Sequence, residues 1–387
     1  MRILDIRERA VPVRSSMRNA AFDFSEMTTS IVAVVTDVVR NGRPVIGYAF
    51  NSTGRYACGA AMRDRFIPRV LAAPPDELTD AAGLLDPAKV AARMGLREKP
   101  GGEAERSTPI GTIETAVWDA LAKALDRPLW HVLSERYGTG QVPGRIPCYS
   151  GGGWYQPTDD LASLRNEIRQ RLDDGYSFVK IKTGGIALDD DCQRIEAALA
   201  LLGEGHRLAV DANAALPQDR AVAYVDRLAS YGLRWFEEPC GPQAFSDFSQ
   251  LAERYAPPLA TGENLFCLTD VENLLRFGGF RLGKDILQID PPQAFGIAAF
   301  AKIVERVLAL GGSRAGFFPH GGNMMSLAVV AGLGLGGCEA YPGVFGAFGG
   351  YAEDVTLEGG TLSLPQSPGI GFERQPALFA LMQELAS

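Results

Sequence analysis

The sequence of 387 residues has few cysteines, very few histidines, no excess of basic residues and no long hydrophobic run. Its six cysteines are scattered without C-x-x-C spacing, which argues against a disulfide framework or a zinc site and favours reduced thiols in the cytoplasm. Asp and Glu outnumber Lys and Arg by 46 to 38, for a net charge of −8. The charge therefore gives no reason to expect a nucleic acid or an anionic membrane as partner. No apolar run approaches the ~18 residues of a membrane span, and the first residues lack the apolar core of a signal peptide.

The composition provides material for a large core. Hydrophobic residues make up 46% of the chain and charged residues 22%, as in an ordinary globular protein. This length predicts two domains, or one large barrel with an appendage. Apolar runs at 31–38 and 45–50 flank the turn signal Asn41-Gly42, which predicts an antiparallel hairpin, and apolar residues recur at helical spacing over 112–125. Residues 1–130 are therefore predicted to form an α+β module.

Eight short apolar runs follow, each separated from the next by a stretch of helical length. This alternation is typical of parallel strands joined by helices, and eight units predict a closed (β/α)8 barrel over residues 131–345, although a doubly wound sheet would share the local pattern. Residues 346–387 lose the alternation and are predicted to return to the N-terminal module. The predicted strands are 146–150, 178–182, 208–211, 234–237, 259–263, 286–290, 315–319 and 337–340.

Three of the predicted strands end in an acidic residue at equal intervals. Asp211, Glu237 and Glu263 are spaced 26 residues apart, which is one strand–helix unit, so all three belong at the carboxyl-terminal rim where barrel active sites form. Converging carboxylates repel one another unless a cation lies between them, and oxygen ligands without Cys or His favour Mg²⁺ over zinc. The alternative is that each acid is an isolated strand-end residue or helix N-cap.

The strand before these acids ends in Lys180-Ile181-Lys182. Because side chains alternate along a strand, both lysines share one face. If that face is the barrel interior, each ammonium group depresses the pKa of the other, which yields a lysine that acts as a base near neutral pH. If the face points outward, both are ordinary solvated lysines. The acids on the next three strands favour the interior.

Among the three histidines, His320 is the one that ends a predicted strand, across the barrel from the two lysines. The strand beside it ends in Asp290, and a carboxylate next to a histidine orients the ring and supports its cationic form. Glu339 ends the eighth strand, and Asn213 lies on the same face as Asp211. These side chains would complete a ring of polar groups at one end of the barrel.

A lysine base, a carboxylate-held Mg²⁺ and a distant histidine acid suit removal of a proton next to a substrate carboxylate. His320 could then protonate a leaving β-hydroxyl, which is dehydration to a 2-keto acid. It could instead protonate the opposite face of the α-carbon, which is racemisation or epimerisation. A third alternative is a protein that binds metal and carboxylate without turnover, although such a protein has no need of both Lys182 and His320.

These motifs together resemble the enolase superfamily, mandelate racemase type: K-x-K, D-x-N, E-E-P and G-E-N at one-unit intervals, then Asp and His on strands six and seven. Stretches such as RNAAFDF (18–24), ATGENLF (260–266) and PHGGNMMSL (319–327) are most similar, within that family, to its bacterial D-tartrate dehydratases. The resemblance implies a Mg²⁺-dependent hydro-lyase of a small hydroxy diacid or acid sugar, with tartrate as the first candidate. It also implies that the N-terminal module caps the barrel and selects the substrate, and that the protein is a homo-oligomer.

The same resemblance assigns roles to individual residues. The base would be Lys182 with Lys180 beside it, and the acid His320 paired with Asp290. The metal ligands would be Asp211, Glu237 and Glu263. The substrate contacts would include Asn19, Lys99, Asn213 and Glu339. The chain departs from the family pattern at Thr53 and Gln156, which both belong to the shell around the substrate, so the resemblance defines the chemistry better than the substrate.

Overall fold

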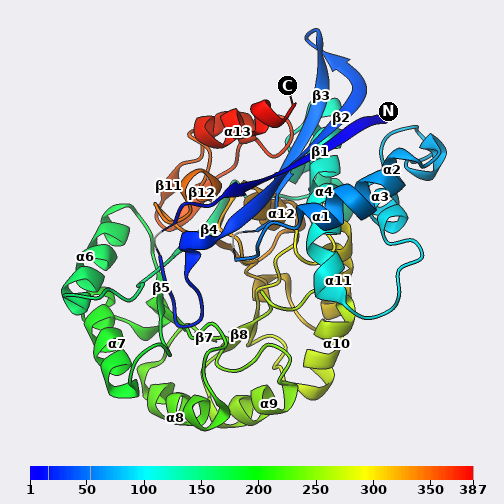
Figure 1. The fold of residues 1–387 in the computed structure, drawn as a ribbon. Helices are drawn as coiled ribbons and strands as arrows, with labels where there is room; N and C mark the ends of the chain where they lie inside the picture. Colours follow the sequence, from blue (N-terminus) through cyan, green and yellow to red (C-terminus); the bar gives the residue numbers. More distant parts are fainter. Residues whose placement is uncertain (16, 53, 387) are drawn as a thin grey trace.

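The computed structural model describes residues 1–15, 17–52 and 54–386. The chain begins with a three-stranded antiparallel sheet and a group of helices, continues as a ring of parallel strands surrounded by helices, and ends in a segment that returns to the first sheet (Figure 1). The predicted architecture, a (β/α)8-type barrel with an α+β cap, is confirmed. The boundaries at residues 130 and 345 stay a prediction.

The sheet of the cap consists of β1 (Ile3–Pro12), β2 (Thr28–Arg40) and β3 (Arg43–Phe50), paired in that order and antiparallel. Asn41 and Gly42, with φ of 51° and 74°, form the tight turn between β2 and β3. Both positions need the left-handed conformation that Asn and Gly tolerate, so this dipeptide specifies the turn. The predicted hairpin is confirmed.

Helix α4 (Glu103–Ala124) packs along β2 and β3 and begins earlier than predicted, running through Pro109. A proline inside a helix removes one backbone hydrogen bond. Here the helix is buried from Arg106 to Ala122, and this burial outweighs the lost bond. The other helices of this part are α1 (Gly59–Ala61), α2 (Ile67–Leu71), α3 (Pro87–Met94) and α5 (Leu129–Tyr137).

The parallel strands of the barrel pair in chain order from β4 to β9, and β10 pairs back with β4. The seventh predicted strand, 315–319, is wrong as a strand: in the described chain its only bridge joins Phe317 to Leu287, because a 3₁₀ turn occupies its first residues. Backbone bonds still close the ring there, from Phe318 N to Leu287 O and from Gly336 N to Phe317 O. The strands are β4 (Arg145–Gly152), β5 (Val179–Lys182), β6 (Leu208–Asp211), β7 (Phe236–Glu237), β8 (Leu259–Thr261), β9 (Ile286–Leu287) and β10 (Cys338–Ala340).

Helices surround this ring on the outside (Figure 1). Each of them buries apolar side chains against the strands, and α12 is buried on all sides because it also packs against α5. They are α6 (Asp160–Asp173), α7 (Leu188–Leu202), α8 (Gln218–Leu228), α9 (Phe245–Arg254), α10 (Leu268–Phe277), α11 (Ile297–Ala309) and α12 (Met324–Leu333).

Inside the barrel, the alternation of side chains stacks a polar layer on an aromatic one. Phe178 lies two residues before Lys180, and Trp235 lies two residues before Glu237, so each aromatic residue shares its face with the polar residue that follows. The aromatic layer is a separate buried cluster of Tyr149, Phe178, Ala209, Trp235, Ala260 and Phe318. Because this cluster fills the amino-terminal end of the barrel, the polar side chains collect at the carboxyl-terminal end.

The C-terminal segment joins both parts of the chain. Strands β11 (Leu357–Glu358) and β12 (Thr361–Ser363) form a hairpin that extends the sheet at β4. Helix α13 (Pro376–Ala386) lies against β1 and β2 (Figure 1). Arg9 on β1 donates to the carbonyl of Leu381, and the rings of Tyr48 and Phe379 are 6.0 Å apart. The predicted return to the N-terminal module is therefore observed.

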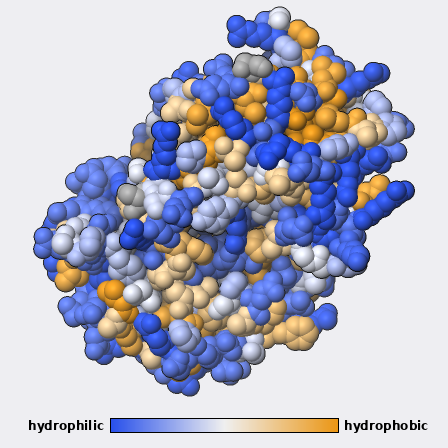
Figure 2. Space-filling model, in the orientation of Figure 1, coloured by the Kyte–Doolittle hydropathy of each residue, from blue (hydrophilic) through white to orange (hydrophobic). Residues whose placement is uncertain are grey.

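The surface is hydrophilic over most of the barrel in the view of Figure 2, whereas apolar side chains gather over the sheet of the cap. Leu4 on β1 and Val39 on β2 are 59% and 64% exposed. In the described part of the chain, the helices are all too short or too polar to cross a membrane.

A single buried carboxylate connects the cap to the barrel. Glu114 on α4 is fully buried, and its two oxygens accept hydrogen bonds from the backbone N–H groups of Ile297 and Ala298, at 2.9 and 3.0 Å. The indole of Trp118 donates a third, at 2.8 Å. The two backbone groups begin α11 and have no partner within that helix, so Glu114 acts as its N-cap from another part of the chain.

We expect Glu114→Ala to lower the free energy of unfolding by about 3 kcal/mol, because it leaves three buried donors without an acceptor. Denaturant titration followed by circular dichroism measures the change. Glu105→Ala on the same helix is the control: its side chain is 65% exposed, so the change should stay within about 0.5 kcal/mol. Equal stability of the two variants would contradict this role for Glu114.

Candidate active site

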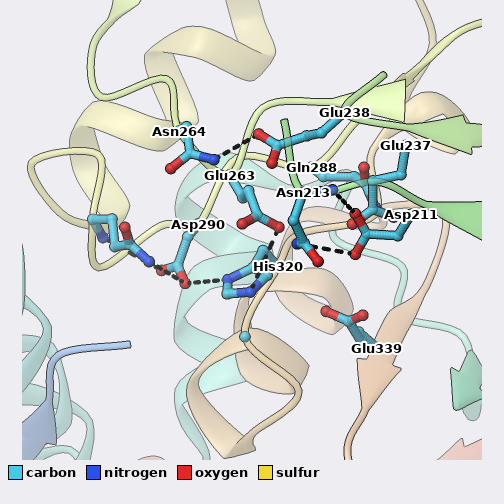
Figure 3. Close-up of polar contacts among 12 residues, drawn as sticks. Asp211, Asn213, Glu237, Glu238, Glu263, Asn264, Gln288, Asp290, His320 and Glu339 are labelled. Carbon is cyan, nitrogen blue, oxygen red and sulfur yellow. Dashed lines mark hydrogen bonds and ion pairs between the residues drawn. The ribbon is translucent and has the colours of Figure 1, made fainter. Parts of the chain in front are cut away.

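Carboxylates from successive strands gather at the carboxyl-terminal end of the barrel (Figure 3). Asp211 ends β6 and Glu237 ends β7, and both are buried. Glu263 follows β8 and is half-buried. Its carboxylate is turned toward His320 (Figure 3), with Oε2 at 3.8 Å from Nε2 of the ring. The three acids thus share one rim of the barrel, with the third on the side of the histidine.

Both lysines of β5 point into the barrel among these carboxylates. Lys180 Nζ lies 2.6 Å from Glu237 Oε1, 2.7 Å from Glu339 Oε1 and 3.3 Å from Asp211 Oδ2. Lys182 Nζ lies 2.5 Å from Asp211 Oδ2. The outward orientation is therefore excluded. The expected depression of the pKa is wrong for Lys180: burial lowers it, but Glu237 and Glu339 outweigh burial and raise the pKa well above its usual value.

Glu237 is held on both of its oxygens. Oε1 accepts from Lys180, while Oε2 accepts from Trp235 Nε1 at 3.0 Å and from Gln288 Nε2 at 2.7 Å. Figure 3 shows the Gln288 amide beside this carboxylate. Donors from three different strand regions thus fix the orientation of one acid.

The acids outnumber the bases in this cluster. Burial raises the pKa of Glu237 to about 8, with a further contribution from Asp211, and burial together with Glu263 raises the pKa of Glu238 well above its usual value. The lysines therefore do not balance the buried negative charge, whereas a divalent cation with oxygen ligands would. In the described part of the chain no three such side chains converge as metal ligands do: Asp211 and Glu237 pair with the lysines, while Glu263 faces His320. In donor type and charge, the cluster fits a hard divalent cation.

His320 lies beside Asp290 at the rim of the barrel. Its Nδ1 is 3.1 Å from Asp290 Oδ2, and Asp290 is buried. Burial lowers the pKa of His320, but Glu263 and Asp290 outweigh burial and raise this pKa to about 9. These two carboxylates therefore favour the protonated ring, which is the form that a general acid needs.

The cap covers this end of the barrel, and residues of both parts line a small cavity of about 20 Å³ between them. Lys182 reaches the cavity, whereas Lys180 lies deeper, between Glu237 and Glu339. The lining residues include Lys182, Asn213, Glu263 and His320 from the barrel, and Asn19, Phe22, Phe24 and Arg55 from the cap.

The predicted substrate contacts are brought together only in part. Asn19 and Asn213 line the cavity, and the buried Oδ1 of Asn213 has no hydrogen-bond partner within the described residues. Glu339 is buried beside Lys180. It therefore lies in the polar layer with the lysine rather than on the cavity wall.

Two further residues of that predicted shell lie elsewhere. Lys99 and Gln156 are exposed and do not line the cavity. Lys99 is in the loop between α3 and α4, and Gln156 follows β4. Thr53 lies outside the described residues.

The structure adds site residues that sequence reasoning missed. Glu238 and Asn264 stand directly after two of the predicted ligands, in the E-E-P and G-E-N motifs, and the Asn264 amide donates to Glu238 at 2.6 Å (Figure 3). Their position in the motifs was an available signal. Arg55, Gln288 and Gln293 had no such signal, because their loops meet only in the folded chain.

A family model confirms part of the resemblance. Residues 163–378 match the family described as enolase C-terminal domain-like. The chain belongs to this family, within the enolase superfamily of mandelate racemase type. Its nearer relation to the tartrate dehydratases stays a prediction.

Individual relatives differ in their reactions. An arabinonate dehydratase from Saccharolobus solfataricus is 26% identical over 279 residues, which cover 70% of each chain. A 3,6-anhydro-α-L-galactonate cycloisomerase from Streptomyces coelicolor is 26% identical over 379 residues, 96% of each chain. Among solved structures, a racemase from Streptomyces coelicolor with bound magnesium superposes with a TM-score of 0.77 at 22% identity, covering 96% of this chain and 98% of that one.

Proposed function

We propose that the protein is a Mg²⁺-dependent hydro-lyase that removes water from a small hydroxy acid or acid sugar, with tartrate as the first candidate substrate. One observation carries this proposal: a buried lysine pair stands among strand-end carboxylates on one side of the cavity, and His320, held by Asp290, lines the same cavity. The dehydratase among the relatives supports the reaction class.

In the proposed reaction, Lys182 is the base. It lines the cavity, so its amine in the neutral form can accept the α-proton of a bound hydroxy acid. Lys180 stays charged between Glu237 and Glu339, and its ammonium attracts the substrate carboxylate toward this side of the cavity. The two lysines thus have separate roles, set by their partners.

His320 is the proposed acid. As the α-proton leaves, the electron pair of the C–H bond moves toward the substrate carboxylate, and the C–O bond to the β-hydroxyl then breaks. His320 gives its proton to the departing oxygen, which leaves as water, and the enol that remains becomes a 2-keto acid. Asp290 holds the ring and favours its charged form before the transfer.

The proposed metal ligands are Asp211, Glu237 and Glu263. Bound there, Mg²⁺ would supply positive charge next to the substrate carboxylate, where negative charge develops. The magnesium in the related racemase structure supports this choice of metal.

Two other reactions share the same first step. A racemase would use His320 to protonate the opposite face of the α-carbon, and the racemase and cycloisomerase among the relatives keep an isomerase as the second candidate. A protein that binds metal without turnover would leave Lys182 and His320 without a role.

We expect Mg²⁺ to stabilise the EDTA-treated protein, by about 2.7 kcal/mol at a concentration 100 times its dissociation constant. Glu237→Gln should lose most of this stabilisation and the activity together, because one hard ligand is gone. Thermal unfolding with and without Mg²⁺ measures the stabilisation. Glu253→Gln, at an exposed position on α9, is the control and should keep the full response. Full activity after metal removal would contradict the assignment.

We expect Lys182→Ala to slow the exchange of the substrate α-proton with deuterium from solvent by at least about 100-fold, because the base is gone. Proton NMR of the substrate in D₂O measures the exchange. Lys302→Ala, an exposed lysine on α11, should exchange at the wild-type rate. Unchanged exchange in Lys182→Ala would mean that another group is the base.

The reaction of His320→Asn separates dehydration from racemisation. In a dehydratase this variant should lose water release by about 100-fold or more, while Lys182 still exchanges the α-proton slowly. In a racemase, wild-type protein would interconvert stereoisomers and release no 2-keto acid. A coupled 2-keto acid assay and NMR measure both outcomes, with the exposed His206→Asn as control. Interconversion without keto acid would overturn the dehydratase proposal.

A further inference from the structure

Arg55 is a cation of the cap that lines the same cavity as Lys182. It lies just after β3 and is half-buried. The structure places its guanidinium against two neutral amides: Nε donates to Gln293 Oε1 at 2.9 Å, and Nη2 donates to Asn264 Oδ1. Among the described residues no carboxylate forms an ion pair with it, whereas Arg18, another arginine of the cap, pairs with Asp23 at 2.8 Å.

The two amides are themselves held by acids. The Asn264 amide group donates to Glu238 at 2.6 Å, and the Gln293 amide group donates to Asp290 at 3.2 Å. Each amide thus donates a hydrogen bond from its N–H group to a buried carboxylate, and its oxygen accepts a hydrogen bond from Arg55. This arrangement orients the guanidinium without neutralising its charge.

The guanidinium also has N–H groups that neither amide engages, and these can donate hydrogen bonds to a ligand. The ring of Phe266 lies 4.8 Å below the guanidinium carbon and keeps its plane in place. Arginine has five N–H donors, of which Nε and Nη2 are engaged by the amides, while Nη1 donates to no described residue. A fixed, charged fork of this kind matches a carboxylate better than a hydroxyl group.

We propose that Arg55 binds a second carboxylate of the substrate, so that the enzyme selects hydroxy diacids over hydroxy monoacids. The proposal rests on the proposed function, because the first carboxylate is the one placed near the lysines. A diacid would then meet a cationic side chain at each end: Lys180 on the barrel side and Arg55 on the cap side. A monoacid of the same length would leave the charge of Arg55 unpaired in a partly buried site, which is costly.

The test compares diacids with monoacids of equal carbon number: tartrate stereoisomers with threonate and erythronate, and galactarate with galactonate. Wild-type protein should have the higher kcat/KM for the diacid of a pair. Arg55→Gln should lower kcat/KM for the diacid by about 10- to 100-fold, mainly through KM, and change the monoacid by about threefold at most. Arg18→Gln is the matched control, a cap arginine that does not line the cavity, and should keep the wild-type ratio.

Two results would overturn the proposal. A wild-type preference for monoacids would exclude a carboxylate at Arg55. An equal loss for both members of a pair in Arg55→Gln, together with a lower melting temperature, would mean that Arg55 only ties the cap to the barrel. Calorimetric titration of the same acids measures the binding preference without turnover. Protein that binds diacids through Arg55 but exchanges no α-proton would contradict the proposed reaction and leave this binding role intact.

Discussion

The site depends on the burial of more carboxylates than nearby cations can neutralise. Asp211, Glu237 and Glu339 surround the ammonium groups of Lys180 and Lys182 at distances of 2.5 to 3.3 Å. Unpaired charges in a low-dielectric interior are expensive, so the barrel must hold each of them in a fixed arrangement. The aromatic layer beneath provides that rigidity, because it fills the other end of the barrel with close-packed rings. Residual negative charge is then concentrated at the rim of the barrel, where the proposed metal ligands lie.

The barrel part of the site could be predicted because two regular spacings in the sequence determine it: the alternation of side chains along a strand and the length of a strand–helix unit. The period of two along a strand puts Lys180 and Lys182 on one face, and the length of a strand–helix unit brings Asp211 and Glu237 to one rim. The seventh strand could not be predicted in the same way. Its single bridge at Phe317 depends on neighbouring chain segments, and its own apolar residues do not reveal this.

The pKa of a buried group was harder to predict than its position. Two neighbouring lysines alone would depress each other's pKa, and that argument failed for Lys180 because the structure brings Glu237 and Glu339 closer to it than sequence spacing could indicate. The residues of the cap present the same difficulty. Asn19 reaches the cavity and Lys99 does not, yet both belong to loops whose course follows from packing between the parts of the chain.

The connection between cap and barrel explains why a cap residue can matter to the chemistry. Gln293 accepts a hydrogen bond from Arg55 and donates one to Asp290, and Asp290 in turn holds His320. The cap loop therefore belongs to the same hydrogen-bonded chain as His320. Hydrogen bonds in such a chain polarise one another in a low dielectric, so a ligand carboxylate bound as proposed at Arg55 would act on the Asp290 carboxylate through Gln293. In the proposed reaction, where Asp290 favours the protonated form of His320, recognition at the cap and proton transfer at the rim would be electrostatically linked.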